Sequence, residues 1–102
     1  MQALLKGSKR QWTGDKIELI EIAYGIYYTR RMNNGKVEVR DIIEWLEDTL
    51  SVDLSDAYRM FADIQRRKAS SYTKYLEEMI SAIHEHIEEK NRFKAVKRKT
   101  NK

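Results

Sequence analysis

The sequence contains no proline, and its four glycines all lie within the first 35 residues. Proline and glycine are the two residues that most strongly disfavour the interior of a helix. Beyond Gly35 the chain lacks both, so we expect its last two thirds to be almost entirely helical. Cysteine is absent as well, which excludes a disulfide framework and a site that binds metal through thiolates.

Length and hydropathy indicate one water-soluble domain. The chain has 102 residues, which is enough for a single modest core. No stretch approaches the ~20 apolar residues of a membrane span. The N-terminal residues also lack the apolar stretch of a signal peptide. We therefore expect a cytoplasmic protein with no membrane contact.

The first helix is expected to run from Thr13, which suits an N-cap, to about Arg31. Trp12 and Ile17 have the spacing of a hydrophobic staple around that cap. Residues 32–35, Met-Asn-Asn-Gly, are expected to end the helix, since Asn and Gly tolerate positive φ. The residues with core spacing are Ile17, Ile20, Ala23, Tyr24, Tyr27 and Tyr28.

The middle of the chain predicts a strand and two helices. Lys36–Arg40 alternates and is β-branched, so it predicts one short strand. Asp41, with Glu44 three residues on, predicts the cap of a second helix that ends near Ser51. Asp53 predicts the cap of a third helix. The core residues expected on these helices are Ile42, Ile43, Trp45, Leu46, Thr49 and Leu50, then Leu54, Ala57, Tyr58, Phe61 and Ile64.

A fourth helix is expected after the short link Ala69–Tyr72, capped by Ser71 or Thr73. Lys90–Lys102 contains seven cations and no acid. We expect this basic stretch to extend the helix by a turn or two and then to fray. The expected core stripe of the fourth helix is Leu76, Met79, Ile80, Ile83 and Ile87.

This order of elements predicts a mainly α fold, a four-helix domain of winged-helix-like or helix-turn-helix type with one short strand. The wing should be reduced, because the few residues between Lys68 and Thr73 cannot hold two strands and a turn. At most one or two residues near Ser70–Tyr72 would pair with Val37–Val39. We expect a flexible segment over residues 1–11, the domain over 12–90 and a basic tail over 91–102.

Charge is distributed unevenly along the chain. Residues 1–16 carry a net charge of +3, residues 17–65 carry −5, and residues 66–102 carry +6. Such asymmetry favours a polyanionic partner at one side or end of the fold. Ordinary solubility explains the same charges without any partner.

No set of residues indicates catalysis, a metal or a cofactor, so we do not expect an enzyme. His84 and His86 lie two apart on a helix and face different directions. The stretch that contains them is not a His-Glu-x-x-His zinc motif. The glycines are isolated and form no phosphate-binding loop.

Several ordered motifs resemble the C-terminal part of RteC proteins, regulators on tetracycline-resistance conjugative transposons. The motifs are Trp12–Thr13, Leu19–Tyr24, Asn33–Gly35, Asp53–Leu54, Tyr58–Phe61, Arg67–Lys68 and Thr73–Leu76. They cover about residues 11–90. The resemblance implies a winged-helix-type domain that binds promoter DNA and activates transcription of excision genes. Members of that family look about twice as long, with a further N-terminal domain.

In a DNA-binding protein of this kind the third helix would enter the major groove of double-stranded DNA. Ser55, Arg59 and Arg66 fall on one line of its outer face, and Arg59 is the best candidate for reading a base. Further cations would hold phosphates or add salt-sensitive affinity. They are Arg66, Arg67, Lys68, Lys74, Lys94, Lys97, Arg98 and Lys99.

Two alternatives remain open at this stage. Cations in the last turn of a helix complement its dipole, and Arg59 with Asp63 is an ordinary surface pair. The chain could also be a protein-interaction or dimerisation module without direct DNA contact. Its partner would then be a second copy or the missing N-terminal domain, and an exposed apolar patch around Tyr27, Tyr28 and Met32 would support that role.

Overall fold

The computed structural model describes the backbone of residues 10–100 and the side chains of residues 10–92. The chain divides into two compact units, and the second begins at Thr73. The predicted flexible segment 1–11 lies almost entirely outside the described residues. No helix among the described residues is both long and apolar enough to cross a membrane.

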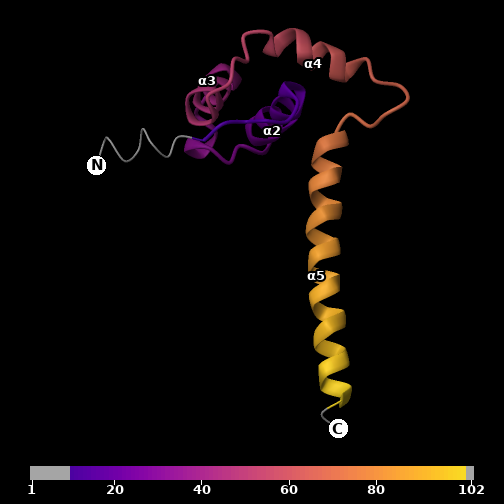
Figure 1. Ribbon diagram of the computed structural model, residues 1–102. Helices are drawn as coiled ribbons and strands as arrows, with labels where there is room; N and C mark the ends of the chain where they lie inside the picture. The colour runs from indigo at the N-terminus through magenta and orange to yellow at the C-terminus, as the bar shows by residue number, and fades with distance from the viewer. Residues whose placement is uncertain (1–9, 101–102) are drawn as a thin grey trace. The chain divides into compact units, whose positions relative to one another are not determined.

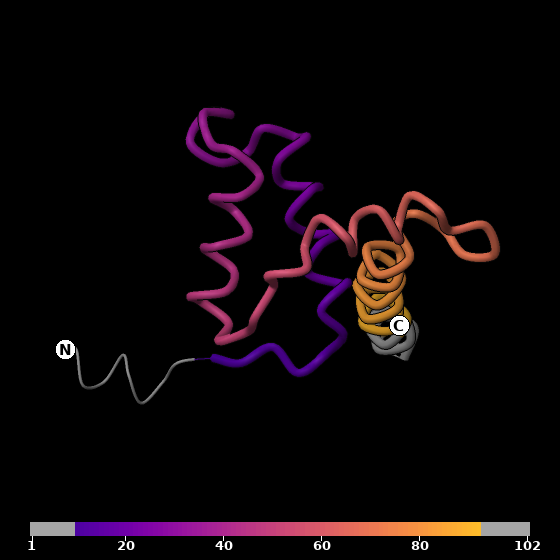
Figure 2. The backbone as a smooth tube through the Cα atoms, turned by 90° about the horizontal axis from the view of Figure 1, so that it is seen from above, coloured from indigo at the N-terminus to yellow at the C-terminus, as the bar shows by residue number. Residues whose placement is uncertain are grey.

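The first unit contains three helices, of which α2 is contacted by the other two (Figure 1). Its elements are α2 (Lys16–Thr29), a 3₁₀ turn η1 (Asn33–Gly35), α3 (Val39–Leu50) and α4 (Ala57–Gln65). Both α3 and α4 pack against α2 (Figure 2). The buried apolar side chains are Leu19, Ile20, Ala23, Tyr24, Ile42, Ile43, Leu46, Leu54, Ala57, Met60 and Ile64.

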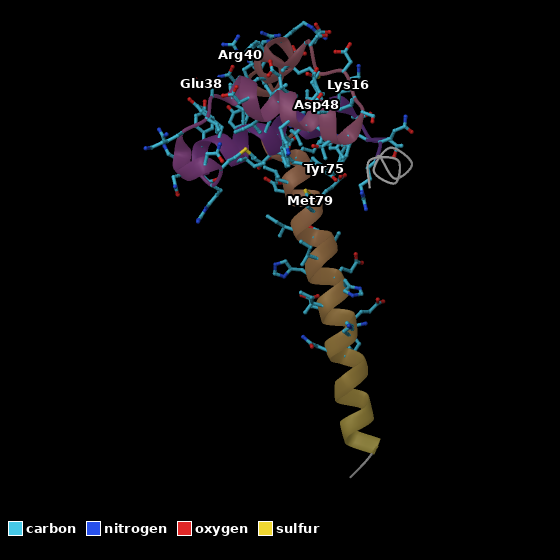
Figure 3. The ribbon with its side chains drawn as sticks, turned by 90° about the vertical axis from the view of Figure 1, so that its left-hand side faces the viewer. Lys16, Glu38, Arg40, Asp48, Tyr75 and Met79 are labelled. Atoms are coloured by element: carbon cyan, nitrogen blue, oxygen red, sulfur yellow. The ribbon has the colours of Figure 1, made fainter. Side chains whose placement is uncertain are left out.

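The N-cap of α2 is Asp15, not Thr13 as predicted. Trp12 ties this start to α3, since its backbone N–H donates to the Leu50 carbonyl at 2.9 Å. Its indole Nε1 donates to the Asp15 carbonyl at 3.0 Å. Lys16 of α2 and Asp48 of α3 lie at the same end of the helix pair (Figure 3). The helices α2 and α3 therefore run in opposite directions.

The chain reverses between α2 and α3 through backbone that favours Asn and Gly. Arg30, Asn33, Asn34 and Gly35 all have positive φ. A Cβ added to Gly35 would lie 2.9 Å from Cδ of Arg30. The helix α2 ends at Thr29 with Arg30 as its C-cap, two residues before the predicted end near Arg31, and Asn33–Gly35 form the turn that follows.

The predicted strand Lys36–Arg40 is wrong, since no strand forms anywhere in residues 10–100. The helix α3 begins at Val39 and its N-cap is Glu38. Asp41, predicted as the cap, instead accepts a hydrogen bond from the Glu38 N–H at 3.0 Å. This bond starts the helix within the β-branched stretch and overrides its strand propensity. The expected pairing of Ser70–Tyr72 with Val37–Val39 is likewise not found.

A six-residue link, 51–56, joins α3 to α4. Ser51 ends α3 in the left-handed region with φ of 50°. The Leu54 N–H donates to the Glu47 carboxylate at 2.6 Å, so the link is fastened to α3. The N-cap of α4 is Asp56, whereas Asp53 was predicted.

The predicted core is confirmed in most of its aliphatic members and wrong in several aromatic ones. Tyr28, Trp45 and Tyr58 are exposed, although their spacing put them in the core. Met60 is buried and was not predicted. Tyr24 stacks on Phe61, with ring centroids 3.7 Å apart and planes 2° from parallel. This stack joins α2 to α4.

The second unit consists of one continuous helix, α5 (Lys74–Thr100). The Glu77 N–H donates to the Thr73 carbonyl at 2.9 Å, which makes Thr73, not Ser71, the residue at the cap position. Every residue from Ser81 to Arg92 is exposed. The predicted core stripe of this helix is therefore wrong for Met79, Ile80, Ile83 and Ile87, all of which are exposed.

Candidate nucleic-acid interface

The consecutive helices α3 and α4 both pack on α2 and are joined by the six-residue link. The buried sides of α3 and α4 share one core with α2. Ser55, Tyr58, Arg59 and Arg66 are exposed on or beside α4. Arg59 and Arg66 share Asp63 as a partner, whereas Ser55 lies in the link before α4.

Arg59 is exposed, with 64% of its side-chain surface open to solvent. It is nevertheless paired with two carboxylates. Its Nη2 donates to Asp56 at 3.0 Å and its Nη1 to Asp63 at 3.4 Å. The hydrogen bond and charge of Asp56 raise the pKa of the Arg59 guanidinium above its usual value. Arg66 pairs with the same Asp63. Solvent-exposed pairs of this kind contribute little to stability, so a nucleic acid could replace them at small cost.

Ser55 lies in the turn that leads into α4. Its N–H donates to Asp53 Oδ1 at 2.9 Å. This bond and the Ser55 side chain lower the pKa of the Asp53 carboxyl below its usual value. Asp56 and Asp63 give the outer side of α4 two carboxylates beside its two arginines. That side is therefore not a uniformly positive surface.

Arg67 points inward, unlike its neighbour Arg66. Its Nη1 donates to Glu21 Oε2 of α2 at 2.9 Å, and their side chains are 14% and 2% exposed. The same nitrogen approaches the carbonyls of Ser71 at 3.0 Å and Tyr72 at 3.3 Å. Arg67 thus holds the segment after α4 against α2. We therefore assign it to the fold and leave it out of the proposed DNA contacts.

The remaining predicted cations follow α4 in the chain. Lys68 is exposed in the segment that follows α4, and Lys74 is exposed at the start of α5. The side chains predicted at Lys94, Lys97, Arg98 and Lys99 lie outside the described residues.

The sequence analysis missed two exposed side chains next to Ser55. A groove between α3 and α4 is lined in part by Arg40, Ser55 and Tyr58. Arg40 had been assigned to the strand that does not form, and Tyr58 to the core. Arg40 lies at the start of α3 next to Glu38 (Figure 3). A prediction that α3 begins at Val39 would have placed Arg40 on that helix and not on a strand.

The family model described as RteC protein matches residues 2–91. This chain belongs to the RteC family. Searches of the curated proteins and of the solved structures found no significant match.

The family match of this RteC chain includes α2, α3, α4 and most of α5. It ends at residue 91, just after the basic stretch begins at Lys90. The family assignment therefore covers the helix pair and leaves most of the basic stretch outside the match.

Within residues 10–92 of the RteC chain, no three His, Cys, Asp or Glu side chains gather where they could hold a metal ion. An apolar hollow beside α4 is lined by Phe61, Ile64, Gln65 and Tyr72. Gln65 and the Tyr72 hydroxyl are the polar groups of this lining.

Proposed function

We propose that this RteC-family chain is a DNA-binding domain of a transcriptional regulator, with α4 entering the major groove of promoter DNA. The observation that carries the proposal is the α3–α4 pair, held on α2 with Arg59 open to solvent. A helix needs such an exposed outer side to reach base edges. The family assignment supports the same role.

In this proposal Arg59 exchanges its two aspartates for a guanine, whose two acceptors match its paired donors. Ser55 contacts a base or a phosphate at the start of α4. Arg66, Lys68 and Arg40 hold phosphates and set the orientation of the domain. The basic residues Lys74, Lys94, Lys97, Arg98 and Lys99 add affinity that depends on salt.

The carboxylates of α4 shape the specificity of this binding. Asp56 and Asp63 repel phosphates whenever the arginines are displaced from them. A base contact by Arg59 must outweigh that repulsion, so nonspecific binding through α4 alone should be weak. Non-cognate DNA would then be held mainly by the other cations, whose contribution falls as salt rises.

By the resemblance to regulators of mobile elements, we extend the proposal to activation of excision-gene promoters. Action on DNA implies a cytoplasmic protein that works by binding, without a cofactor, a membrane or enzymatic turnover. The second candidate is a protein-interaction module without DNA contact. The exposed apolar side chains of α5 favour it.

The test is titration of the full chain with promoter duplex and with random duplex at two salt concentrations. We expect tighter binding to the promoter and a steep loss of affinity with salt on both duplexes. Arg59→Ala should cost about 1–3 kcal/mol on the promoter and little on random DNA. No binding to either duplex at low salt would refute the proposal and leave the interaction module.

Asp63→Asn is a matched variant whose expected effect on DNA affinity is opposite to that of Arg59→Ala. It removes a carboxylate from the outer side of α4 while keeping the side-chain size. Binding to both duplexes should tighten, because phosphate repulsion falls and Arg59 and Arg66 are released. Weaker binding by this variant would contradict an approach of DNA along α4.

A further inference from the structure

The connection between α2 and α3 carries a cluster of exposed cations outside the core. Residues 30–40 hold four cations and one acid, a net charge of +3. All four cationic side chains are exposed, and they are Arg30, Arg31, Lys36 and Arg40. The first three form what we call the basic turn. Arg40 follows on the first turn of α3.

These cations differ from the exposed arginines of α4 in their partners. Arg59 and Arg66 are both paired with aspartates. Within residues 10–92, no ion pair involves the basic turn or Arg40. The Arg30 Nη1 donates to a neutral group, the Gly35 carbonyl, at 3.3 Å. A phosphate that approaches the basic turn therefore has no carboxylate to displace, whereas a phosphate that approaches α4 does.

The backbone of the basic turn is held by its own hydrogen bonds. The Gly35 N–H donates to the Met32 carbonyl at 2.8 Å, and the Lys36 N–H donates to the Asn33 carbonyl at 3.0 Å. These bonds close the 3₁₀ turn η1 between the two helices. The cations thus extend from an ordered backbone, so binding through them costs less ordering than binding through a flexible loop.

Arg40 connects the basic turn to the start of α4. It comes four residues after Lys36, and it lines the groove between α3 and α4 together with Ser55 and Tyr58. The basic turn therefore adjoins the part of α4 that is proposed to enter the major groove. A duplex in that position would bring its sugar-phosphate backbone toward the basic turn.

The rest of α3 and the link after it carry the opposite charge. Residues 41–56 contain six acids and no cation. Glu44 and Glu47 line the same groove further along α3. Asp48 lies at the other end of the α2–α3 pair from Arg40 (Figure 3). Phosphates are thus attracted at the end with the basic turn and repelled along the rest of α3, so charge favours one direction for the duplex.

We propose that the basic turn is a further DNA-backbone site, in which Arg30, Arg31 and Lys36 hold phosphates beside the major groove that α4 enters. This inference rests on the proposed function and extends its contact surface to a second part of the fold. The ligand is the sugar-phosphate backbone of double-stranded DNA. The site therefore adds affinity and orientation on every sequence, and it does not read bases.

The first test compares variants of the full chain that each remove one positive charge. Lys36→Gln changes the basic turn, and Lys16→Gln changes the other end of the α2–α3 pair (Figure 3). Both are titrated with promoter duplex and random duplex over a range of salt. Lys36→Gln should lower the slope of log K against log salt by about 0.9 on both duplexes. Lys16→Gln should change that slope much less.

A double variant enlarges the effect. Arg31→Gln with Lys36→Gln should lower the salt slope by about 1.8 and weaken both duplexes by at least about tenfold near 0.1 M salt. The ratio of promoter to random affinity should stay at the parent's value, unlike that of Arg59→Ala. Arg31→Lys with Lys36→Arg keeps both charges and should bind as the parent does. Circular dichroism checks that each variant remains folded.

Neutral phosphates locate the contact on the duplex. Single phosphates of the promoter duplex are replaced with methylphosphonates, which carry no charge. Some of these replacements should weaken binding of the parent and have little effect on the Arg31→Gln, Lys36→Gln double variant. Equal losses for the parent and the double variant at every position would contradict a phosphate contact by the basic turn.

Three other results would overturn the inference. They are an unchanged salt slope in the double variant, a Lys16→Gln effect as large as that of Lys36→Gln, and a loss confined to the promoter duplex. Each of them leaves the proposed function standing, because Arg59→Ala tests α4 separately on the same duplexes. A parent chain that binds neither duplex at low salt would refute the proposed function and this site together.

Discussion

Replacing Arg67 should destabilise the first unit far more than replacing its neighbour Arg66. The Arg67 guanidinium lies 2.9 Å from a Glu21 carboxylate that is 2% exposed. Removing one member of such a buried pair leaves the other charge poorly solvated and costs about 3–5 kcal/mol. Arg66 pairs with Asp63 at the surface, where 69% and 41% of the two side-chain surfaces are open to water. Losing an exposed pair costs at most about 1 kcal/mol.

The assay is urea unfolding of the full chain followed by circular dichroism and tryptophan fluorescence. With an m value of about 1 kcal/mol/M, Arg67→Ala should lower the midpoint by about 3–5 M. Arg66→Ala should lower it by less than about 1 M. A domain of this size has only about 5–15 kcal/mol of stability, so Arg67→Met is the milder variant if Arg67→Ala does not fold.

A double variant separates the charge pair from the packing around it. Glu21→Leu with Arg67→Met removes both charges and keeps apolar volume, so it should recover much of the stability that Arg67→Met loses. Equal effects of Arg66→Ala and Arg67→Ala would refute the inward role of Arg67. No recovery in the double variant would show that the bonds to the Ser71 and Tyr72 carbonyls matter more than the bond to Glu21.

The structure leads to four further predictions, each checked by an equilibrium measurement. Gly35→Ala should cost about 1–2 kcal/mol of unfolding free energy, since φ is +80° there and the new Cβ would crowd Arg30. Asp41→Ala should cost about 0.5–2 kcal/mol by removing the bond to the start of α3, with Asp41→Asn retaining part of it. The pKa of Asp53 is lowered in the folded state, so its ionised carboxylate stabilises the fold. This stabilisation is present above about pH 3.9, the unfolded pKa, and is lost as pH falls through the folded pKa. The unfolding free energies of Asp53→Asn and the parent should thus differ at pH 7 and converge in acid. Burial raises the pKa of Tyr24, so phenolate absorbance should show one tyrosine ionising at higher pH than the others, and its stabilising effect should be lost as pH rises above about 10.

The sequence predicted the helical content and most of the aliphatic core, because both depend on local spacing. Ile42, Ile43, Leu46 and Ile64 were expected to be buried from their positions alone, and they are. The prediction of a strand at residues 36–40 was wrong for a reason that residue spacing does not show. The bond from the Glu38 N–H to Asp41 favours a helix where β-branched residues favour a strand.

The candidate site was predictable only in part, since charge in a sequence does not show direction in space. Arg59, Arg66 and Arg67 look alike as cations near the end of one helix. In the structure Arg66 is exposed, whereas Arg67 turns toward a carboxylate 46 residues earlier in the chain. No local pattern could have revealed a partner so distant. The same limit applies to Met79, Ile80, Ile83 and Ile87, whose spacing indicated an apolar face but not whether this chain covers it.

The long separation between Glu21 and Arg67 also has a consequence for the order of folding. Contacts between α2 and α3 close a short loop, whereas the Glu21–Arg67 bond requires a loop of about 45 residues to close first. We expect α2 and α3 to associate before the rate-limiting barrier and the Arg67 contact to form after it. Loss of that contact should then accelerate unfolding and leave the refolding rate nearly unchanged. The lifetime of the folded first unit would depend on the last contact to form.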